Sequence, residues 1–507
     1  MKKRVAIIGG GFAGLSAACE LAQAGCAVTV FEKNASLGGR CRAFEQKGFL
    51  FDMGPSWYWM PEVFEHFFAR FGSKVADHYE LIRLNPSYKV VFEDGTSVQI
   101  PADLKELKVL LESWETGAGD RLDAFLHEAR IKYEVGMGEF VWKPSVSVVE
   151  FFEWKVLTQG LKLQLFSNMK AHLGRYFSHP KILKLLEFPV LFLGAKPSDT
   201  PALYSLMNYA DLQLGTWYPL GGMSKIPEGM ASVGRSLGVD YRCGVEVNKI
   251  EVDRNQVTAI YVDQERHEFD AVIAAADYHH VETRLLDKAH RNYSDSYWES
   301  RTMAPSSLLF YVGLDKKIPG LNHHNLFFDR DFDVHSREIY DQPQWPSAPL
   351  FYACVPSITD AAVAPEGHEN LFMLIPVAPG MQSDEVNRER YFNECIERLE
   401  KETGVSIAPH VVYQRSYAHE EFIADYHSFK GNAYGLANTL SQTAFLKPKM
   451  KNKKVRNLYY AGQLTVPGPG VPPSIISGLV AADLCLKELG LRSSAESILI
   501  TEKQSRA

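Results

Sequence analysis

Residues 4–40, RVAIIGGGFAGLSAACELAQAGCAVTVFEKNASLGGR, decide the fold of this chain. The run 4–8 is short, apolar and rich in β-branched residues, as a buried parallel strand should be. Residues 13–24 are rich in Ala and Leu and predict a helix, which Gly25 ends. A second strand is expected over 27–32. The stretch therefore predicts a strand–helix–strand unit with a glycine loop between its first two elements.

The glycine loop carries a GxGxxG motif made by Gly9, Gly11 and Gly14. The first glycine permits a tight turn, the second lets a pyrophosphate approach the backbone, and the third lets helix and strand pack closely. The N-terminus of the helix then presents free N–H groups to the phosphates. Glu32 ends the second strand, where a carboxylate can accept hydrogen bonds from both ribose hydroxyls. The alternative is a solvent-facing glutamate in an ordinary turn, but the context favours a dinucleotide site.

A second glycine turn follows shortly after this carboxylate. It is formed by Gly38, Gly39 and Arg40, and the segment 52–55 (DMGP), which contains Gly54, adds another backbone turn. A glycine turn with an arginine at this position extends the contacts along a longer cofactor. This favours FAD over NAD. The alternative is a loop whose glycines are coincidental.

The C-terminal region holds a third glycine-rich segment. A strand is expected over 458–462 and a helix over 474–489, and between them lies 467–474, PGPGVPPS. Glycine and proline at this density fix a turn, and the helix that follows presents its N–H groups to an anion. Reduced flavin is anionic, so this loop is predicted to face the flavin. A rigid loop without a ligand is the alternative.

The cofactor signals lie at both ends of the chain and in its middle. We therefore expect an α/β fold with a discontinuous Rossmann-type FAD-binding domain and an inserted, mixed α+β substrate-binding domain that includes a helical, membrane-facing part. The expected boundaries are 1–84, 220–300 and 450–507 for the FAD-binding domain, and 85–219 and 301–449 for the substrate-binding domain. Helices are expected over 60–84 and 103–135, and strands over 245–252, 257–262, 269–275, 305–313 and 349–356.

Composition narrows the classes of function and location. Of the 507 residues, 46% are hydrophobic and 23% charged, which is typical of a folded globular protein. The net charge of -7 argues against nucleic acid as a partner. The chain runs directly into a strand without a signal-peptide pattern, and it contains no run of about 18 apolar residues, so a cytoplasmic location is expected.

Cysteine and histidine spacing does not predict a metal site or a disulfide framework. The seven cysteines are scattered and include no CxxC pair. The sixteen histidines, including the pairs at 279–280 and 323–324, show no recognisable ligand spacing.

Three segments together resemble the bacterial-type phytoene desaturase (carotenoid desaturase) family of the flavin amine oxidase superfamily. They are 5–40 with 52–57, 218–223 (YPLGGM) and 458–478. The resemblance implies non-covalently bound FAD. It assigns the ADP half to Gly9, Gly11, Gly14, Glu32, Gly39 and Arg40, the adenine to the backbone of Val247, and the flavin to Gly462, Gln463 and Val471. Family members usually carry an acidic or small residue in place of Gln463 and often a single proline where Pro472 and Pro473 stand, which leaves the flavin contacts less defined.

The resemblance also implies the reaction, which is repeated dehydrogenation of a long polyene, from phytoene to lycopene. The flavin would take a hydride and a proton would then leave the substrate. Asp211 is a candidate base, although an aspartate in such a stretch more often lies on the surface. Close alternatives are a desaturase of hydroxylated or C30 carotenoids, a carotenoid isomerase and a ketolase. A non-catalytic isoprenoid-binding protein of the same fold is also open, but the intact Glu32 and the Gly-Gly-Arg turn argue against it.

The middle of the chain suggests how such a substrate reaches the site. Large apolar residues gather between 145 and 225, either as core or as walls of a polyene tunnel, and the resemblance favours the tunnel. Between 143 and 184, seven basic residues interleave with aromatic residues and only two acidic ones. This predicts peripheral attachment to the inner face of the cell membrane, with helices packed on the core as the alternative. The aromatic side chains of residues 57–59 either line the polyene site or pack in the protein core. No second nucleotide loop is evident, so oxygen or a quinone is the expected electron acceptor.

Overall fold

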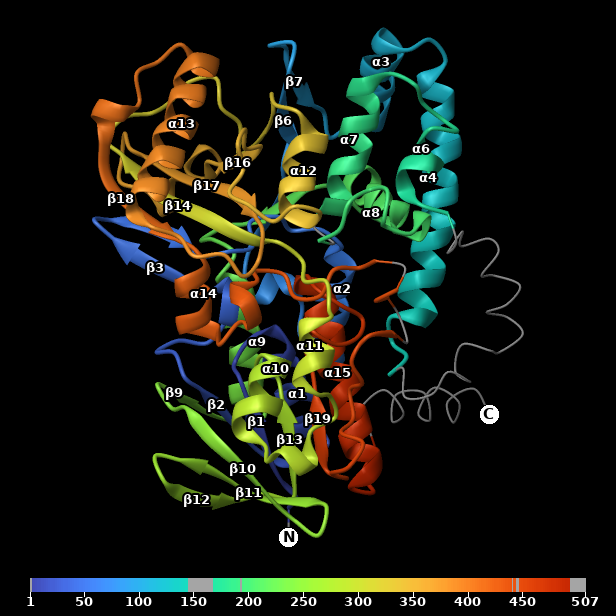
Figure 1. Cartoon of the computed structure of the whole chain (residues 1–507), viewed down its shortest axis with the longest axis vertical. Coiled ribbons are helices and arrows are strands. Elements are labelled where there is room, and N and C mark those ends of the chain that lie inside the picture. Colours follow the sequence, from blue (N-terminus) through green and yellow to red (C-terminus); the bar gives the residue numbers. More distant parts are fainter. Residues whose placement is uncertain (1, 145–166, 192–193, 440, 444–445, 493–507) are drawn as a thin grey trace.

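A five-stranded parallel sheet forms the lower part of the molecule (Figure 1). The computed structural model describes residues 2–144, 167–191, 194–439, 441–443 and 446–492. In sheet order, the strands are β19 (Leu458–Tyr460), β13 (Ala271–Ala274), β1 (Arg4–Ile8), β2 (Ala27–Glu32) and β9 (Asp240–Cys243). Every neighbouring pair is parallel. Strands from the two ends of the chain and from its middle therefore meet in one sheet.

Both faces of this sheet are buried, which explains the unbroken apolar run of β1. Val5 and Ile7 point to the face covered by α1 (Phe12–Gln23). Ala6 and Ile8 point to the opposite face, against a three-stranded antiparallel sheet. This alternation follows from the two-residue period of a strand. The covering strands are β10 (Val247–Asp253), β11 (Gln256–Val262) and β12 (Glu265–Glu268).

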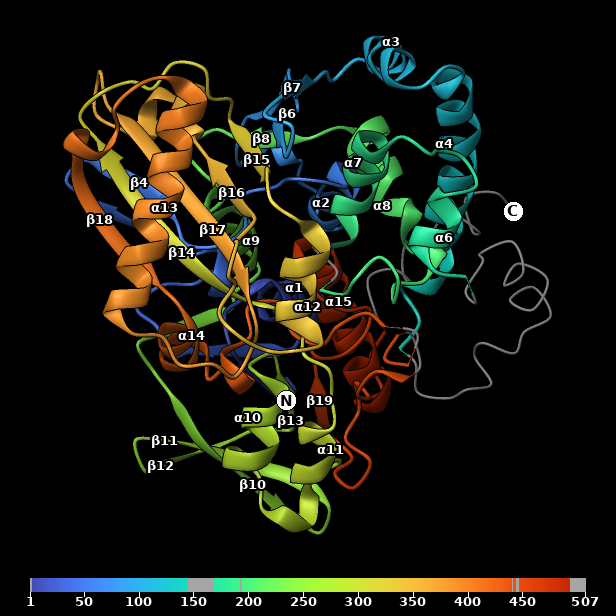
Figure 2. The ribbon, with the colours of Figure 1, turned by 45° about the horizontal axis from the view of Figure 1, so that its top comes forward.

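Helices α1 and α15 (Val471–Glu488) pack closely behind the sheet (Figures 1 and 2). A Cβ added at Gly478 of α15 would lie 2.1 Å from the carbonyl oxygen of Ala13. The Ser16 hydroxyl of α1 donates to the carbonyl of Ile475 at 2.9 Å. This contact brings the C-terminal glycine segment to the start of α1, beside the first glycine loop.

The local predictions around the cofactor motifs are largely confirmed. The strands expected over 4–8 and 27–32 have these bounds, and the helix expected over 13–24 runs over 12–23. The last helix begins at Val471, three residues before the expected start. Proline fits the first turn of a helix, where its missing N–H would have no partner, so the two prolines after Val471 do not delay the helix.

A larger, seven-stranded sheet lies above the parallel sheet in Figure 1. In sheet order, the strands are β18 (Val411–Tyr417), β14 (Ser306–Leu314), β17 (Glu369–Val377), β16 (Phe351–Cys354), β15 (His324–Phe328), β6 (Tyr88–Phe92) and β7 (Ser97–Ile100). Only the β15–β6 pair is parallel among these strands. Helix α13 (Glu385–Thr403) packs through Tyr391 and Ile396 on the face that carries Phe310.

Much of this sheet was not predicted from the sequence. Strands were expected only near β14 and β16, while β6, β7, β15, β17 and β18 were missed. Most of the missed pairings join distant segments, such as β6 with β15, which no local turn signal marks. The exception is the β6–β7 hairpin, whose turn 93–96 (EDGT) carries a local Asp-Gly signal that was overlooked. The helix expected over 60–84 was also too long. It ends at Arg70 (α2, Pro61–Arg70), and β5 (Leu81–Arg83) pairs instead with β8 (Trp217–Pro219).

A group of helices stands beside the large sheet, at the upper right of Figure 1. It comprises α3 (Leu104–Trp114), α4 (Ala118–Val135), α6 (Met169–Leu173), α7 (Pro180–Leu191) and α8 (Leu206–Tyr209). The structure also has α9 (Lys225–Ser236), α10 (Tyr278–His280), α11 (Asp295–Glu299), α12 (Phe332–Tyr340), α14 (His419–Tyr426) and a hairpin of β3 (Ala43–Gln46) and β4 (Phe49–Asp52). Among the residues described, no helix combines the length and apolar character needed to span a bilayer.

Much of the predicted membrane-facing segment lies outside the described residues, which omit 145–166. The apolar residues expected there as core or tunnel walls, 151–166, fall in the same gap. Those from 203 to 212 are described, and they pack in or against the main hydrophobic core. Of the basic residues, Lys181 pairs with Asp94 at 2.7 Å and Lys184 with Glu93 at 3.1 Å.

Candidate cofactor and active site

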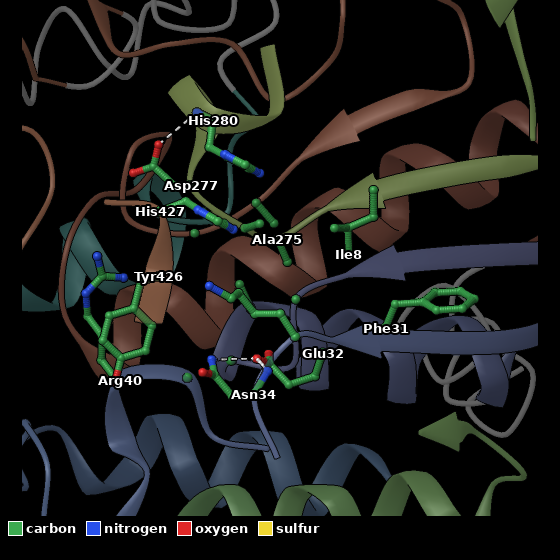
Figure 3. A pocket seen from close by; sticks show the side chains of 18 of the residues that line it. Ile8, Phe31, Glu32, Asn34, Arg40, Ala275, Asp277, His280, Tyr426 and His427 are labelled. Carbon is green, nitrogen blue, oxygen red and sulfur yellow. Dashed lines mark hydrogen bonds between the residues drawn. The ribbon is translucent and has the colours of Figure 1, made fainter. Parts of the chain in front are cut away.

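An open cavity lies at the carboxyl ends of β1, β2 and β13 (Figure 3). It encloses about 1030 Å³ including its mouth. In open α/β sheets, ligands bind at this edge, where the strand order reverses. The predicted site residues that line the cavity are Gly9, Gly11, Glu32, Gly39, Arg40, Val247, Gly462 and Gln463. The fold thus gathers all three glycine-rich segments and the start of β10 around one space.

The three glycines of the first loop have different surroundings. Gly9 has φ +106°, and a Cβ there would lie 2.9 Å from the carbonyl oxygen of Ala275. A Cβ at Gly14 would lie only 2.0 Å from the carbonyl oxygen of Gly9, so this glycine serves helix–strand packing. At Gly11 the nearest atom would be Gly39 Cα at 3.8 Å, an ordinary contact. Gly11 therefore keeps space free in the cavity itself.

Glu32 is held in the cavity by hydrogen bonds and is 5% exposed. Its Oε2 accepts from the N–H of Gly10 at 2.7 Å, and its Oε1 accepts from both the backbone and the side-chain N–H groups of Asn34 at 2.8 Å (Figure 3). The alternative of a solvent-facing glutamate is wrong. Carboxylate oxygens have further lone pairs, which suits them to accept from ribose hydroxyls as well.

Arg40 is a half-buried cation whose hydrogen-bonding capacity is incompletely used. Its guanidinium lies over the ring of Tyr426 at 4.9 Å (Figure 3). Its Nη2 donates to the hydroxyl of Ser428 at 2.9 Å. Within the described part of the chain, its buried Nε has no hydrogen-bond partner. Burial lowers the pKa of Arg40 because the charged form is desolvated. A guanidinium with a buried, unused N–H donor can bind a pyrophosphate, so the residues present here fit the pyrophosphate of FAD.

Gly14, Gly54 and Val471 lie close to this cavity without lining it. Gly54 packs on the backbone of Arg40, because a Cβ there would lie 2.6 Å from the Arg40 carbonyl oxygen. It also lines a smaller cavity, together with Asp52, Ser56, Tyr218 and Cys354 among others. Val471 begins α15 and packs against a core cluster that includes Phe12.

Comparison with known proteins gives the family. The model of the flavin containing amine oxidoreductase family matches residues 12–486. The chain belongs to this family. It is 40% identical over 486 residues to a carotenoid 3,4-desaturase of Haloarcula japonica, covering 96% of this chain and 98% of the relative. It is 31% identical over 498 residues to a 4,4'-diapophytoene desaturase (4,4'-diaponeurosporene-forming) of Staphylococcus aureus, covering 96% and 99%.

These matches place the chain among the carotenoid desaturases of the family, as the resemblance predicted, and make it an FAD-dependent oxidoreductase. Solved structures agree in fold. An oxidoreductase from Methanosarcina mazei superimposes with a TM-score of 0.60 at 16% identity, covering 94% of this chain and 99% of the other. A cyclohexylamine oxidase from Brevibacterium oxydans gives 0.57 at 16% identity, covering 97% and 100%. The mixed α/β fold is therefore that of the flavin-dependent amine oxidases.

Several residues that line this cavity belong to no sequence motif. His280 and His427 stack at its rim with ring centres 3.9 Å apart (Figure 3). His427 contacts the carboxylate of Glu246 at 2.7 Å. Asp277 and Tyr426 also line it. These side chains come from the loop after β13 and from the end of α14. Asp277 and His280 follow β13, whose carboxyl end lies at the cavity. Tyr426 and His427 reach the cavity only through the packing of α14 on this region, so local sequence could not place these two there.

Asp211, the candidate base, is buried rather than on the surface. It is 2% exposed, and its carboxylate accepts from the hydroxyls of Tyr88 at 2.8 Å and Thr216 at 3.2 Å. Burial raises its pKa to about 7. The surface expectation is wrong because α8 and the turn after it fold inward beneath β6. Asp211 does not line the FAD cavity, and its catalytic role remains a prediction.

The aromatic run after Gly54 has packing contacts on every ring. Trp57 stacks on the imidazole of His324 with ring centres 4.1 Å apart, and Tyr58 stacks on Phe64 at 4.2 Å. The indole N–H of Trp59 donates to the hydroxyl of Thr216 at 2.8 Å. Tyr58 is completely buried, so packing explains its aromatic side chain. Trp57 is only partly buried.

Replacing Arg40 tests the proposed pyrophosphate contact. Arg40→Met is expected to weaken FAD binding by at least about tenfold, or roughly 1.4 kcal/mol, because a buried charge partner is lost. Arg40→Lys keeps the charge without the planar fork and is expected to fall between Met and wild type. FAD titration of the apoprotein, followed by flavin fluorescence, measures this.

The neighbouring Arg42 provides the matched control for Arg40. Its Nη2 already donates to Asp425 at 2.7 Å and its Nε to the carbonyl of Gly39 at 3.2 Å. Arg42→Met removes the same charge from the same turn and is expected to change FAD affinity by less than about threefold. If Arg40→Met and Arg42→Met lose FAD affinity equally, Arg40 contributes only its positive charge and makes no specific contact with the pyrophosphate.

Proposed function

We propose that this FAD-dependent oxidoreductase desaturates a carotenoid, converting phytoene to lycopene through successive dehydrogenations. The observation that supports this most is similarity to two desaturases over 96% of this chain, combined with three separate glycine-rich segments that line one cavity. The names of these relatives favour a second candidate, an already desaturated or C30 carotenoid. Both candidates use the same cofactor site.

The residues of the chain bind and orient the reactants in this proposal. Bound FAD supplies the acceptor for the hydride removed from the substrate. The first glycine loop and Arg40 hold the pyrophosphate, Glu32 holds the ribose, and the backbone of Val247 contacts the adenine. Gly462, Gln463 and Val471 contact the flavin ring. All these residues lie in the proposed FAD-binding domain, which comprises 1–84, 220–300 and 450–507. The proposed substrate-binding domain comprises 85–219 and 301–449.

Pigment analysis in a bacterium engineered to accumulate phytoene tests this function. Wild-type protein is expected to consume phytoene and give coloured products, resolved by chromatography, while Gly11→Val is expected to leave phytoene unchanged. Parallel strains that accumulate a C30 precursor, a hydroxylated carotenoid or lycopene distinguish the alternatives. Conversion in only one of those strains would replace phytoene by that substrate. No conversion in any strain, with FAD-loaded protein present, would refute desaturation.

Peripheral membrane attachment is proposed because the substrate is water-insoluble and dissolves in bilayers. The local excess of basic and aromatic residues over 143–184 supports it, and oxygen or a quinone is the proposed electron acceptor, at the inner face of the cell membrane. Purified protein is expected to float with vesicles that contain anionic lipid and to be released by salt. Equal flotation with neutral vesicles at any salt concentration would contradict this electrostatic attachment.

A further inference from the structure

Two histidines and a cysteine meet in the large sheet, outside the FAD cavity. His324 begins β15 and faces Cys354, the last residue of β16, as its direct partner in the antiparallel pairing. His323 precedes the strand, and its carbonyl accepts from the N–H of Val355 at 2.8 Å. One ligand atom from each of the three side chains lies within 4.8 Å of the others. The exposed fractions are 4% for His323, 0% for His324 and 3% for Cys354.

Each imidazole has one nitrogen fixed by a hydroxyl. His323 Nδ1 lies 2.8 Å from the Thr359 hydroxyl, and His324 Nδ1 lies 2.6 Å from the Tyr352 hydroxyl. Tyr352 donates its own proton to Ser56 at 2.9 Å, so it accepts from Nδ1–H of His324. This assigns the proton of His324 to Nδ1 and leaves the lone pair on Nε2.

The second nitrogen of both rings is unused. Among the described residues, neither His323 Nε2 nor His324 Nε2 has a hydrogen-bond partner, and both atoms are buried. Buried polar atoms without partners cost free energy and are rare in folded proteins. Within the described ranges, Nδ1 of His172 and of His419 also lack partners, but the two Nε2 atoms differ because they lie beside a thiol and together form a set of three donor atoms.

We propose that His323, His324 and Cys354 form a binding site for a divalent transition metal, with zinc as the best match. Imidazole nitrogen and thiolate sulfur are the ligands that zinc prefers. In metal sites a hydrogen bond on the far ring nitrogen, usually to a carboxylate, a carbonyl or water, fixes the ring orientation, and here a hydroxyl takes that place on each ring. Donor atoms around tetrahedral zinc lie roughly 3.3–3.7 Å apart, so the side chains must close by about 1 Å on binding.

The surroundings support a site with three protein ligands. Trp57 stacks on His324 at 4.1 Å and Tyr218 packs against His323 at 4.5 Å, which limits rotation of both rings. Cys354 also lines the small cavity that contains Asp52 and Ser56, so a water there can take the fourth position.

Cobalt binding to the FAD-loaded, full-length protein tests the proposal. Wild type is expected to bind about one cobalt per chain, with a thiolate-to-cobalt charge-transfer band and the strong visible bands of tetrahedral cobalt. Zinc is expected to displace the cobalt and to raise the melting temperature. Cys354→Ser is expected to lose the charge-transfer band and to bind at least about tenfold more weakly, and His324→Ala to lose the tetrahedral spectrum.

The exposed Cys243 provides the control, since Cys243→Ser should bind cobalt as wild type does. Bound FAD and the circular dichroism spectrum establish that each variant is folded. If the Cys354 variant does not fold, the wild-type spectrum decides alone, because bound cobalt without a charge-transfer band contradicts a thiolate ligand. Absence of cobalt and zinc binding by wild type, or unchanged binding by folded Cys354→Ser, would overturn the site. The latter would place the metal elsewhere, such as at Glu246, His280 and His427.

Discussion

Gly11→Val is expected to abolish FAD binding while leaving the protein folded. The backbone at Gly11 is extended, with φ -79° and ψ -176°, and valine adopts this conformation readily. The nearest protein atom to an added Cβ would be Gly39 Cα, 3.8 Å away, so the Cβ itself fits without a clash. It would instead fill the part of the cavity proposed for the pyrophosphate. We expect at least a 100-fold loss of affinity, about 2.7 kcal/mol, measured by FAD titration of the apoprotein.

Two comparisons keep this prediction specific. The apoprotein of Gly11→Val should match the wild-type apoprotein in circular dichroism and in urea midpoint, because only the ligand space changes. The smaller Gly11→Ala should lose less affinity than Gly11→Val. Wild-type affinity in Gly11→Val would exclude the pyrophosphate from this loop, and a lower urea midpoint of its apoprotein would contradict the open space seen at Gly11.

Gly14→Ala is expected to destabilise the fold itself, whether or not FAD is present, whereas Gly11→Val affects only FAD binding. Its Cβ would lie 2.0 Å from the carbonyl oxygen of Gly9 and 3.3 Å from the side chain of Ile7. A carbonyl at a fixed position in a tight turn cannot rotate away, so α1 would have to move off the sheet. We expect the free energy of unfolding of the apoprotein to fall by about 3 kcal/mol, with low soluble yield.

Gly138→Ala is the matched control for this overpacking. Gly138 lies in a helical turn, is exposed, and an added Cβ would have no atom within 4 Å. The same substitution there is expected to change stability by less than about 1 kcal/mol. Urea unfolding of the apoproteins compares the two variants. A stable Gly14→Ala apoprotein would mean that the helix–strand contact is looser than it is in this structure.

The cofactor half of the protein was accessible from the sequence because its signals are local. A tight turn, a phosphate cradle and a helix start each need particular residues at fixed short spacing, so Gly9, Gly11 and Glu32 could be named from their own segments. The resemblance to desaturases rested on the same motifs. The strands that carry these motifs have the predicted bounds because buried parallel strands are continuous apolar runs.

The rest was decided by contacts between segments that are far apart in the sequence. Apart from the β6–β7 hairpin, the strands missed in the large sheet pair across long intervals, such as β6 with β15. The inward position of Asp211 depends on Tyr88, which lies 123 residues away. Ser428, which binds the guanidinium of Arg40, is 388 residues from it. The meeting of His323 and His324 with Cys354 follows from the register of β15 with β16. The spacing of neighbouring residues does not predict such pairings. They depend on loop closure over long intervals and on the packing of whole sheets.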